Sequence, residues 1–209
     1  QLKALPEYVQ PEWDGEDWRA VQIPTPPPAR RSHAMAYDPL RRRVVLFGGV
    51  DLQSAFADTW EYDGSAWTRR HAGSQNDGRS KLGMAFDPIR GMVLRFGGLG
   101  AGGSYGDTRA WTGSQWSLIG AGGPEPRSAF AMATDAARSS IVLFGGHVDF
   151  GPNTGRQGDT WLWDGASWRQ SVTATPPPAR AQCGMAFDAS TARMVVFGGE
   201  SSGLGPFET

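Results

Sequence analysis

The sequence predicts an all-β fold, a β-propeller built from four-stranded antiparallel blades, and three observations support this prediction. First, a unit of roughly 50 residues occurs four times, with diglycines that begin at Gly48, Gly97, Gly145 and Gly198. Second, segments within each unit alternate large and small side chains, as β-strands do. Third, no segment shows sustained helical periodicity, so we expect very little helix.

Several markers repeat in the same register in each unit. An arginine opens the unit, an aspartate follows the first alternating segment, and a tryptophan comes after the next turn. The arginines are Arg30, Arg79, Arg127 and Arg180, the aspartates are Asp38, Asp87, Asp135 and Asp188, and the tryptophans are Trp18, Trp67, Trp116 and Trp168. The predicted units are about 30–78, 79–126, 127–179, and 180–209 together with 9–29. Residues 1–8 lie outside the repeat as an N-terminal arm or linker.

The sequence of each complete unit predicts four consecutive strands. The first strand is 33–38 and its equivalents 82–87, 130–135 and 183–188, whose small face suits close packing around a central channel. The second is the apolar run before each diglycine, which lacks alternation and so predicts a strand buried on both faces. The third and fourth are joined by tight turns such as Asp63-Gly64. Four antiparallel strands repeated in this way are typical of propeller blades.

The diglycine has a backbone function in this scheme. Glycine adopts angles that a side chain forbids, so two glycines allow the chain to leave the second strand sharply. We expect the tryptophans to fill the wide outer space between neighbouring blades.

These units resemble the kelch repeat family, in the form found in bacterial proteins. The shared marks are the opening arginine with His33, the diglycine after an apolar run, and an aromatic residue followed by tryptophan (Tyr62/Trp67, Trp111/Trp116 and Trp163/Trp168). The resemblance covers about residues 9–209. It implies a propeller, although kelch propellers usually have more blades than four units supply.

The two ends of the chain each match half of a unit. Residues 11–18 match the third and fourth strands, and the C-terminal unit contains only the first and second. The fourth blade is therefore predicted to be split between the termini. Three arrangements remain open: the halves pair within one chain, two chains pair as a homodimer that completes a larger ring, or the chain is part of a longer propeller. Unpaired halves would expose sheet edges, which proteins normally avoid.

The loops between second and third strands differ between units and predict a ligand surface. They span 50–57, 99–106, 147–158 and 200–206, and loops of one face are where binding residues are usually found. The alternative is that these side chains are only solvated loop tips. The polar candidates are Asp51, Gln53, Tyr105, His147, Asp149, Asn153, Arg156 and Glu200.

The four repeated arginines, Arg30, Arg79, Arg127 and Arg180, are expected to ring the channel mouth near this face. Converging guanidinium groups can hold a carboxylate or phosphate. The alternative, which their repetition favours, is that they bond loop carbonyls or repeated aspartates.

Other classes of function are disfavoured. A formal net charge of −1 provides no field that would attract nucleic acid. The apolar runs are too short for a membrane-spanning helix. The three histidines do not form a spaced metal motif, and His33 and Cys183 occupy one packing position of the repeat. We therefore expect no metal, no cofactor and no catalytic residue.

The sequence thus favours a non-catalytic binding module that presents its long-loop face to a protein or small-molecule ligand. The alternatives are a propeller enzyme acting on a sugar-like substrate, as the resemblance allows, and an architectural fragment of a larger propeller. Bacterial kelch-like proteins are often exported, which slightly favours a secreted or cell-envelope location.

Overall fold

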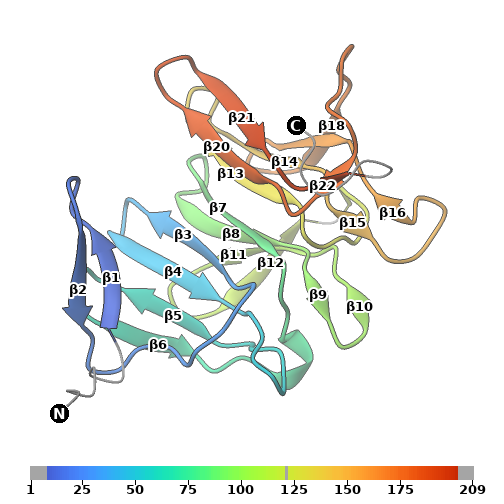
Figure 1. The fold of residues 1–209 in the computed structure, drawn as a ribbon. Helices are drawn as coiled ribbons and strands as arrows, with labels where there is room; N and C mark the ends of the chain where they lie inside the picture. Colours follow the sequence, from blue (N-terminus) through green and yellow to red (C-terminus); the bar gives the residue numbers. More distant parts are fainter. Residues whose placement is uncertain (1–8, 121, 202–209) are drawn as a thin grey trace.

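The structure, a computed structural model, describes residues 9–120 and 122–201, and these form sheets of antiparallel strands (Figure 1). Three sheets have four strands each, and this confirms the all-β prediction with four-stranded antiparallel sheets. The first contains β3 (Ala34–Asp38), β4 (Arg43–Phe47), β5 (Thr59–Tyr62) and β6 (Trp67–His71). The second contains β7 (Gly83–Asp87), β8 (Met92–Phe96), β11 (Thr108–Trp111) and β12 (Trp116–Gly120). The third contains β13 (Ala131–Asp135), β14 (Ser140–Phe144), β17 (Thr160–Trp163) and β18 (Trp168–Ser171).

Shorter pairs of strands complete the described part of the chain. Two of them extend the loops of the second and third units, and the helical content of the described residues is one 3-10 turn at Gln75–Asp77. The pairs are β1 (Val9–Trp13) with β2 (Trp18–Gln22), β9 (Leu99–Gly100) with β10 (Gly103–Ser104), β15 (His147–Val148) with β16 (Gly155–Arg156), β19 (Arg180–Ala181) with β22 (Glu200–Ser201), and β20 (Gly184–Asp188) with β21 (Arg193–Phe197).

The repeated aspartate sets the turn between the first and second strands. Asp38 Oδ1 accepts hydrogen bonds from the backbone amides of Leu40 and Arg41, at 3.1 and 3.0 Å. Asp87 does the same for the next unit. An aspartate side chain that bonds to amides two and three residues onward favours a turn, which explains its recurrence.

The diglycines form the predicted sharp exit from the second strand and also join neighbouring sheets. Gly48 and Gly49 have φ angles of 71° and 98°. The amide of Gly49 donates to the carbonyl of Arg79, the arginine that opens the next unit, at 2.9 Å. A Cβ on Gly48 would lie 2.4 Å from that carbonyl oxygen, so only glycine fits at this junction.

Tryptophans pack between successive sheets, as predicted. Phe47 of the first sheet packs edge-on against Trp116 of the second, with ring centroids 5.5 Å apart. The indole Nε1 of Trp116 donates to the buried hydroxyl of Thr59 at 2.8 Å. Trp168 bonds to Thr108 in the same way at the next junction. Each tryptophan thus contributes apolar contact and one specific hydrogen bond to the sheet before it.

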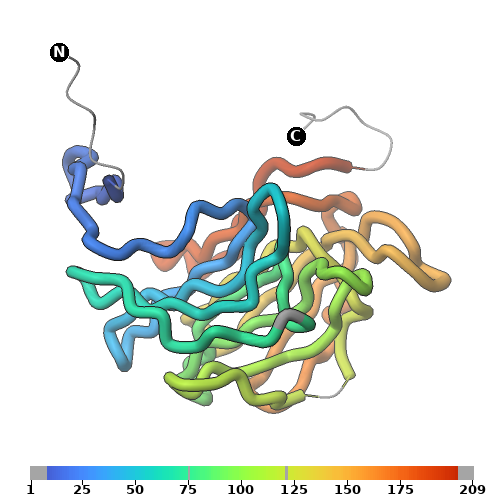
Figure 2. Tube along the Cα trace, turned by 90° about the horizontal axis from the view of Figure 1, so that it is seen from below, coloured from blue at the N-terminus to red at the C-terminus, as the bar shows by residue number. Residues whose placement is uncertain are grey.

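The first strands of successive units, β3, β7, β13 and β20, are neighbours in space. Figure 2 shows the sheets following one another in chain order from blue to red. A cavity of about 240 Å³ lies between the starts of these strands, and the repeated arginines are not among its lining residues. It is lined by Ser32, His33, Lys81, Leu82, Ala129, Phe130, Gln182 and Cys183.

The two end hairpins remain two-stranded in the described residues, so the predicted split blade is not assembled within the chain. The β1–β2 hairpin lies against the first sheet, where the Tyr62 hydroxyl donates to Glu12 at 2.5 Å. The β20–β21 hairpin lies against β13 of the third sheet. Figure 1 shows the two hairpins, blue and red, at separate ends of the row of sheets.

Candidate ligand-binding face

Three of the repeated arginines fasten the start of their unit to the end of its second strand. Arg30 donates to Asp58 through Nη1 and Nη2, at 2.6 and 3.1 Å, and to the carbonyl of Gly48 at 3.0 Å. Arg79 and Arg127 repeat this pattern. The side chains of these arginines are 1–3% exposed, so their geometry matches the structural interpretation of the repeat.

Arg180 differs from the other three. It donates to the carbonyls of Gly198 and Pro178, at 3.0 and 3.3 Å, but has no carboxylate partner among residues 9–120 and 122–201. By the spacing of the repeat, Val9 occupies the position that Asp58 has in the first unit.

A cleft of about 760 Å³ lies beside the second unit, and we call it the Arg79 cleft. Its walls come from the segment before β7, the loop before β11, and strands β11 and β12. The lining residues that carry charge or aromatic surface include Asp77, Arg79, Tyr105, Asp107, Arg109 and Trp116. The Tyr105 ring lies under the Arg79 guanidinium, 3.6 Å from its centre.

Three arginines share two carboxylates at this cleft. Arg79 bridges Asp77 and Asp107, each at 2.5 Å. Arg95 bonds to the other oxygen of Asp77 at 2.6 Å, and Arg109 Nε bonds to Asp107 at 2.6 Å. The group therefore carries one positive charge in excess. Burial alone would raise the pKa of Asp107, but Arg79 and Arg109 outweigh it and hold the pKa below its usual value.

Arg95 departs from the repeat. The equivalent residues of the other second strands are apolar, Leu46, Leu143 and Val196, yet Arg95 is only 1% exposed. Its guanidinium lies 3.9 Å from the Phe47 ring centre, and its Nε and Nη1 atoms have no hydrogen-bond partner among the residues that the structure describes. Burial of the guanidinium lowers the pKa of Arg95 to about 10, and repulsion from Arg79 makes a smaller contribution in the same direction.

Arg95, Asp77 and Arg109 are not among the site residues predicted from the sequence. The signal was present in the apolar run MVLRF, which is the one run among the four with a charge in its interior.

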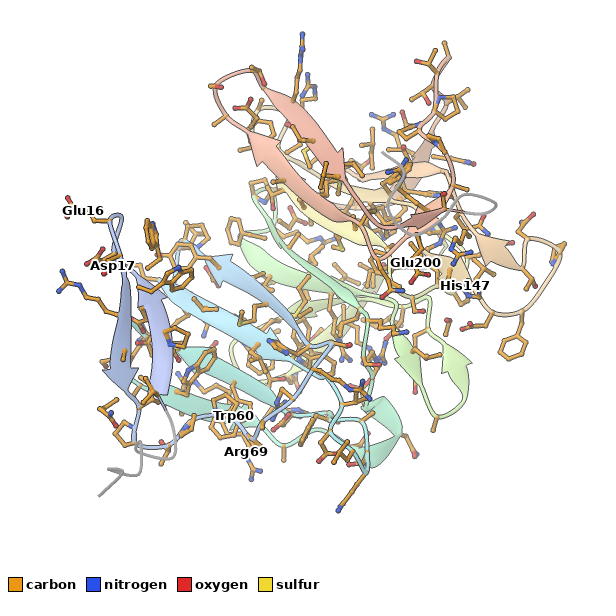
Figure 3. All side chains as sticks on the ribbon, viewed as in Figure 1. Glu16, Asp17, Trp60, Arg69, His147 and Glu200 are labelled. Carbon is orange, nitrogen blue, oxygen red and sulfur yellow. The ribbon has the colours of Figure 1, made fainter. Side chains whose placement is uncertain are left out.

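A second polar cluster lies on the loops of the second, third and fourth units. The Nδ1 atom of His147 lies 3.1 Å from Asp149 Oδ1, and the Ser104 hydroxyl donates to the same carboxylate. Arg156 forms an ion pair with Glu200 at 2.8 Å. Figure 3 shows His147 and Glu200 on the same side of the molecule. The β15–β16 hairpin brings this cluster together, because it pairs His147 with Arg156.

The remaining loop candidates have local roles. Asp51 accepts the amides of Gln53 and Ser54, at 2.7 and 2.8 Å, and these bonds lower its pKa. Asn153 donates to Glu125 at 2.9 Å. The structure thus places Tyr105 at the Arg79 cleft and His147, Asp149, Arg156 and Glu200 in the loop cluster, while Asp51 and Gln53 form a separate turn.

Residues 9–120 and 122–201 contain no group of three or more His, Cys, Asp or Glu side chains that could hold a metal ion. No helix in these ranges is long and apolar enough to span a membrane. Burial, with a contribution from Arg30, lowers the pKa of His33, and burial raises the pKa of Cys183.

Comparison with known protein families and with curated proteins found no match for this chain.

Proposed function

We propose that the chain consists of four kelch-like propeller units, with the strands of the fourth blade divided between its two termini, and that it acts as a non-catalytic binding module. We propose further that its ligand carries a carboxylate or phosphate and binds in the Arg79 cleft. The observation that carries this proposal is the buried Arg95 at a repeat position that is otherwise apolar.

A buried guanidinium with unpaired donors is costly, so its presence needs a compensating role. Arg95 holds one oxygen of Asp77, which leaves the other oxygen for Arg79. Natural proteins break their own packing rules most often at functional sites. The charge that Arg95 brings also leaves the cleft with a positive excess.

Arg109 is the residue best placed to receive an anionic ligand. Its Nε is bonded to Asp107, its side chain is 33% exposed, and its Nη atoms make no hydrogen bond within the described residues. A guanidinium edge of this kind binds a carboxylate or phosphate through two parallel bonds. Trp116 and Leu118 line the same cleft and offer apolar surface for the body of the ligand.

The enzyme alternative is less well supported by this cleft. Acid–base catalysis on a sugar needs a carboxyl group that can hold a proton near neutral pH. The pKa of Asp107 lies below its usual value, and Asp77 shares its oxygens with Arg79 and Arg95. The ion pairs therefore suit binding better than proton transfer.

Citrate and inorganic phosphate are suitable probes, and indole NMR signals report on Trp116. We expect both anions to shift that signal in the native protein and in Arg169→Gln, a control on an exposed residue of β18. The shift should disappear in Arg109→Gln. No shift in the native protein, or an equal shift in Arg109→Gln, would contradict the proposal.

A further inference from the structure

The C-terminal end of the row of sheets exposes residues that are buried at every earlier junction. Phe197 and Val195 of β21 are 72% and 53% exposed. The equivalent residues of β4, Phe47 and Val45, are both fully buried at 0%. The residues are of the same type at equivalent positions, so this exposure marks a surface that no further sheet covers within the described part of the chain.

At the N-terminal end, the face of the first sheet that would pack against the first two strands of a preceding sheet is uncovered in the described residues. Met35 of β3 is 51% exposed, whereas the equivalent Met84 is 6% exposed because the first sheet covers it. Beside Met35 lies a mainly apolar cavity of about 630 Å³, lined among others by Trp13, His33, Tyr62 and Trp67. At the other junctions this space is filled by the first two strands of the preceding sheet.

Backbone hydrogen bonds show the same two open ends. The amides of Lys81, Ala129 and Gln182 each donate to the equivalent carbonyl of the unit before, at 2.9, 2.8 and 2.7 Å. In the described residues this series stops at the amide of Ser32 and the carbonyl of Gln182.

The space around the first glycine of each diglycine also distinguishes the C-terminal end from the three earlier junctions. A Cβ on Gly48, Gly97 or Gly145 would lie 2.4–2.6 Å from the arginine carbonyl of the next unit. Among residues 9–120 and 122–201, no atom outside Gly198 and its two chain neighbours lies within 4 Å of the position that a Cβ on Gly198 would take.

We propose that a second copy of this chain fills each open end, so that two copies close one ring. The β20–β21 hairpin of one copy lies in the Met35 cavity of the other, and β21 pairs with β1 of the partner subunit. Within the first sheet, β4 pairs with β5 so that Val44 faces Tyr62 and Phe47 faces Thr59. The same register across the new junction places Met194 opposite Trp13 of the partner subunit.

The proposed junction also explains two exposed tryptophans. Trp13 and Trp18 are 53% and 65% exposed, while their equivalents Trp111 and Trp116 are 2% and 8% exposed. At the earlier junctions the fourth-strand tryptophan donates to Thr59 or Thr108, both at 0% exposure. Thr160 is the next threonine in this series and is only half-buried. In the proposed junction its hydroxyl would accept a hydrogen bond from the indole Nε1 of Trp18 of the partner subunit.

A second copy fits better than closure of one chain on itself. The three inter-unit backbone bonds are similar in length, 2.7–2.9 Å, so the three junctions repeat one hydrogen-bonding pattern. Bringing the separate end hairpins of one chain together would require a change in at least one of these junctions. Two copies would supply three complete blades each and share two more. The resulting eight blades are within the range of known propellers, and no sheet edge at the split blades stays open.

Light scattering after size exclusion tests the proposal on the full chain at micromolar concentration. The native protein and Leu52→Glu, a control on a 98% exposed loop residue, should both have twice the chain mass. Phe197→Glu and Met35→Glu should each have the mass of one chain with native circular dichroism. An equimolar mixture of the two should recover the double mass, because one of the two junctions then joins unaltered surfaces. A native protein with the mass of one chain, or a mixture without the double mass, would overturn the proposal.

A crosslink distinguishes closure between copies from closure within one chain. Met194→Cys and Trp13→Cys are combined in a Cys183→Ser background, because facing residues of paired strands are close enough for a disulfide. On a non-reducing gel, oxidation should produce a covalent dimer. A crosslink that leaves every chain at single mass would show self-closure and refute the shared ring.

Discussion

Replacing Arg95 by leucine should stabilise the protein, and the size of the effect follows from the burial of the guanidinium. Burial of the guanidinium, together with a smaller contribution from repulsion by Arg79, lowers the pKa of Arg95 from its ordinary value to about 10. At about 1.36 kcal/mol per pKa unit, the charged form costs on the order of 3 kcal/mol in the folded state. The cost is fully present below pH 10 and disappears as the pH rises from the folded pKa to the unfolded one, because the folded state releases its proton first.

Leucine removes this cost but also loses favourable contacts. The stacking of the guanidinium on Phe47 contributes up to about 2 kcal/mol. Asp77 keeps its bond to Arg79, so it is not left unpaired. The net gain should be on the order of 1–2 kcal/mol, or roughly 2–8 °C in the melting temperature for a chain of this length.

Urea unfolding followed by tryptophan fluorescence measures this change, with Arg95→Lys as the control. Lysine keeps the buried charge and loses the planar stacking, so that variant should be less stable than the native protein. Arg95→Leu should also bind citrate more weakly, because the cleft loses its excess positive charge. If Arg95→Leu folds natively and is less stable than the native protein by about 1 kcal/mol or more, the guanidinium is a packing element and the functional argument built on it fails.

Three further predictions concern the junction between the first and second sheets. Trp116→Phe should cost about 1–3 kcal/mol of unfolding free energy, because the buried hydroxyl of Thr59 loses its donor; an unchanged urea midpoint would contradict this. Gly48→Ala should lower the melting temperature by at least several degrees, since its Cβ would lie 2.4 Å from the carbonyl of Arg79; a native-like melting curve would exclude the clash. The lowered pKa of Asp107 contributes stability above the unfolded value of about 3.8, which is lost as the pH falls through the lower folded value. Asp107→Asn should therefore flatten the acid limb of a plot of stability against pH, and an unaltered limb would refute the assignment.

Repetition made the strands predictable. Four copies of one pattern place each diglycine, aspartate and tryptophan in the same structural context, so an accidental match in one unit is corrected by the others. The structure confirms the strands predicted around Asp38 and Gly48, where the aspartate turn and the positive φ angles of the glycines are features of the local sequence.

The site was less predictable because it depends on departures from the repeat. The importance of Arg95 comes from its contacts with Phe47 of another sheet and with Asp77, 18 residues away. The loop pair Arg156–Glu200 likewise joins residues from different units. Whether the end hairpins meet depends on the angle between successive sheets, and no residue pattern within one unit encodes that angle.

The split blade and the ligand face are connected through Arg180. In the other units the third strand supplies an aspartate to this arginine, but the chain has Val9 at the corresponding position of β1. Completing the blade with β1 of a second copy would therefore bury apolar surface without bringing an aspartate of β1 to Arg180. Within residues 9–120 and 122–201, the Arg180 guanidinium bonds to the carbonyls of Gly198 and Pro178, while the Glu200 carboxylate bonds to Arg156 and Gln182. If two copies close the proposed ring, each of its two junctions therefore contains one Arg180 to which β1 supplies no aspartate.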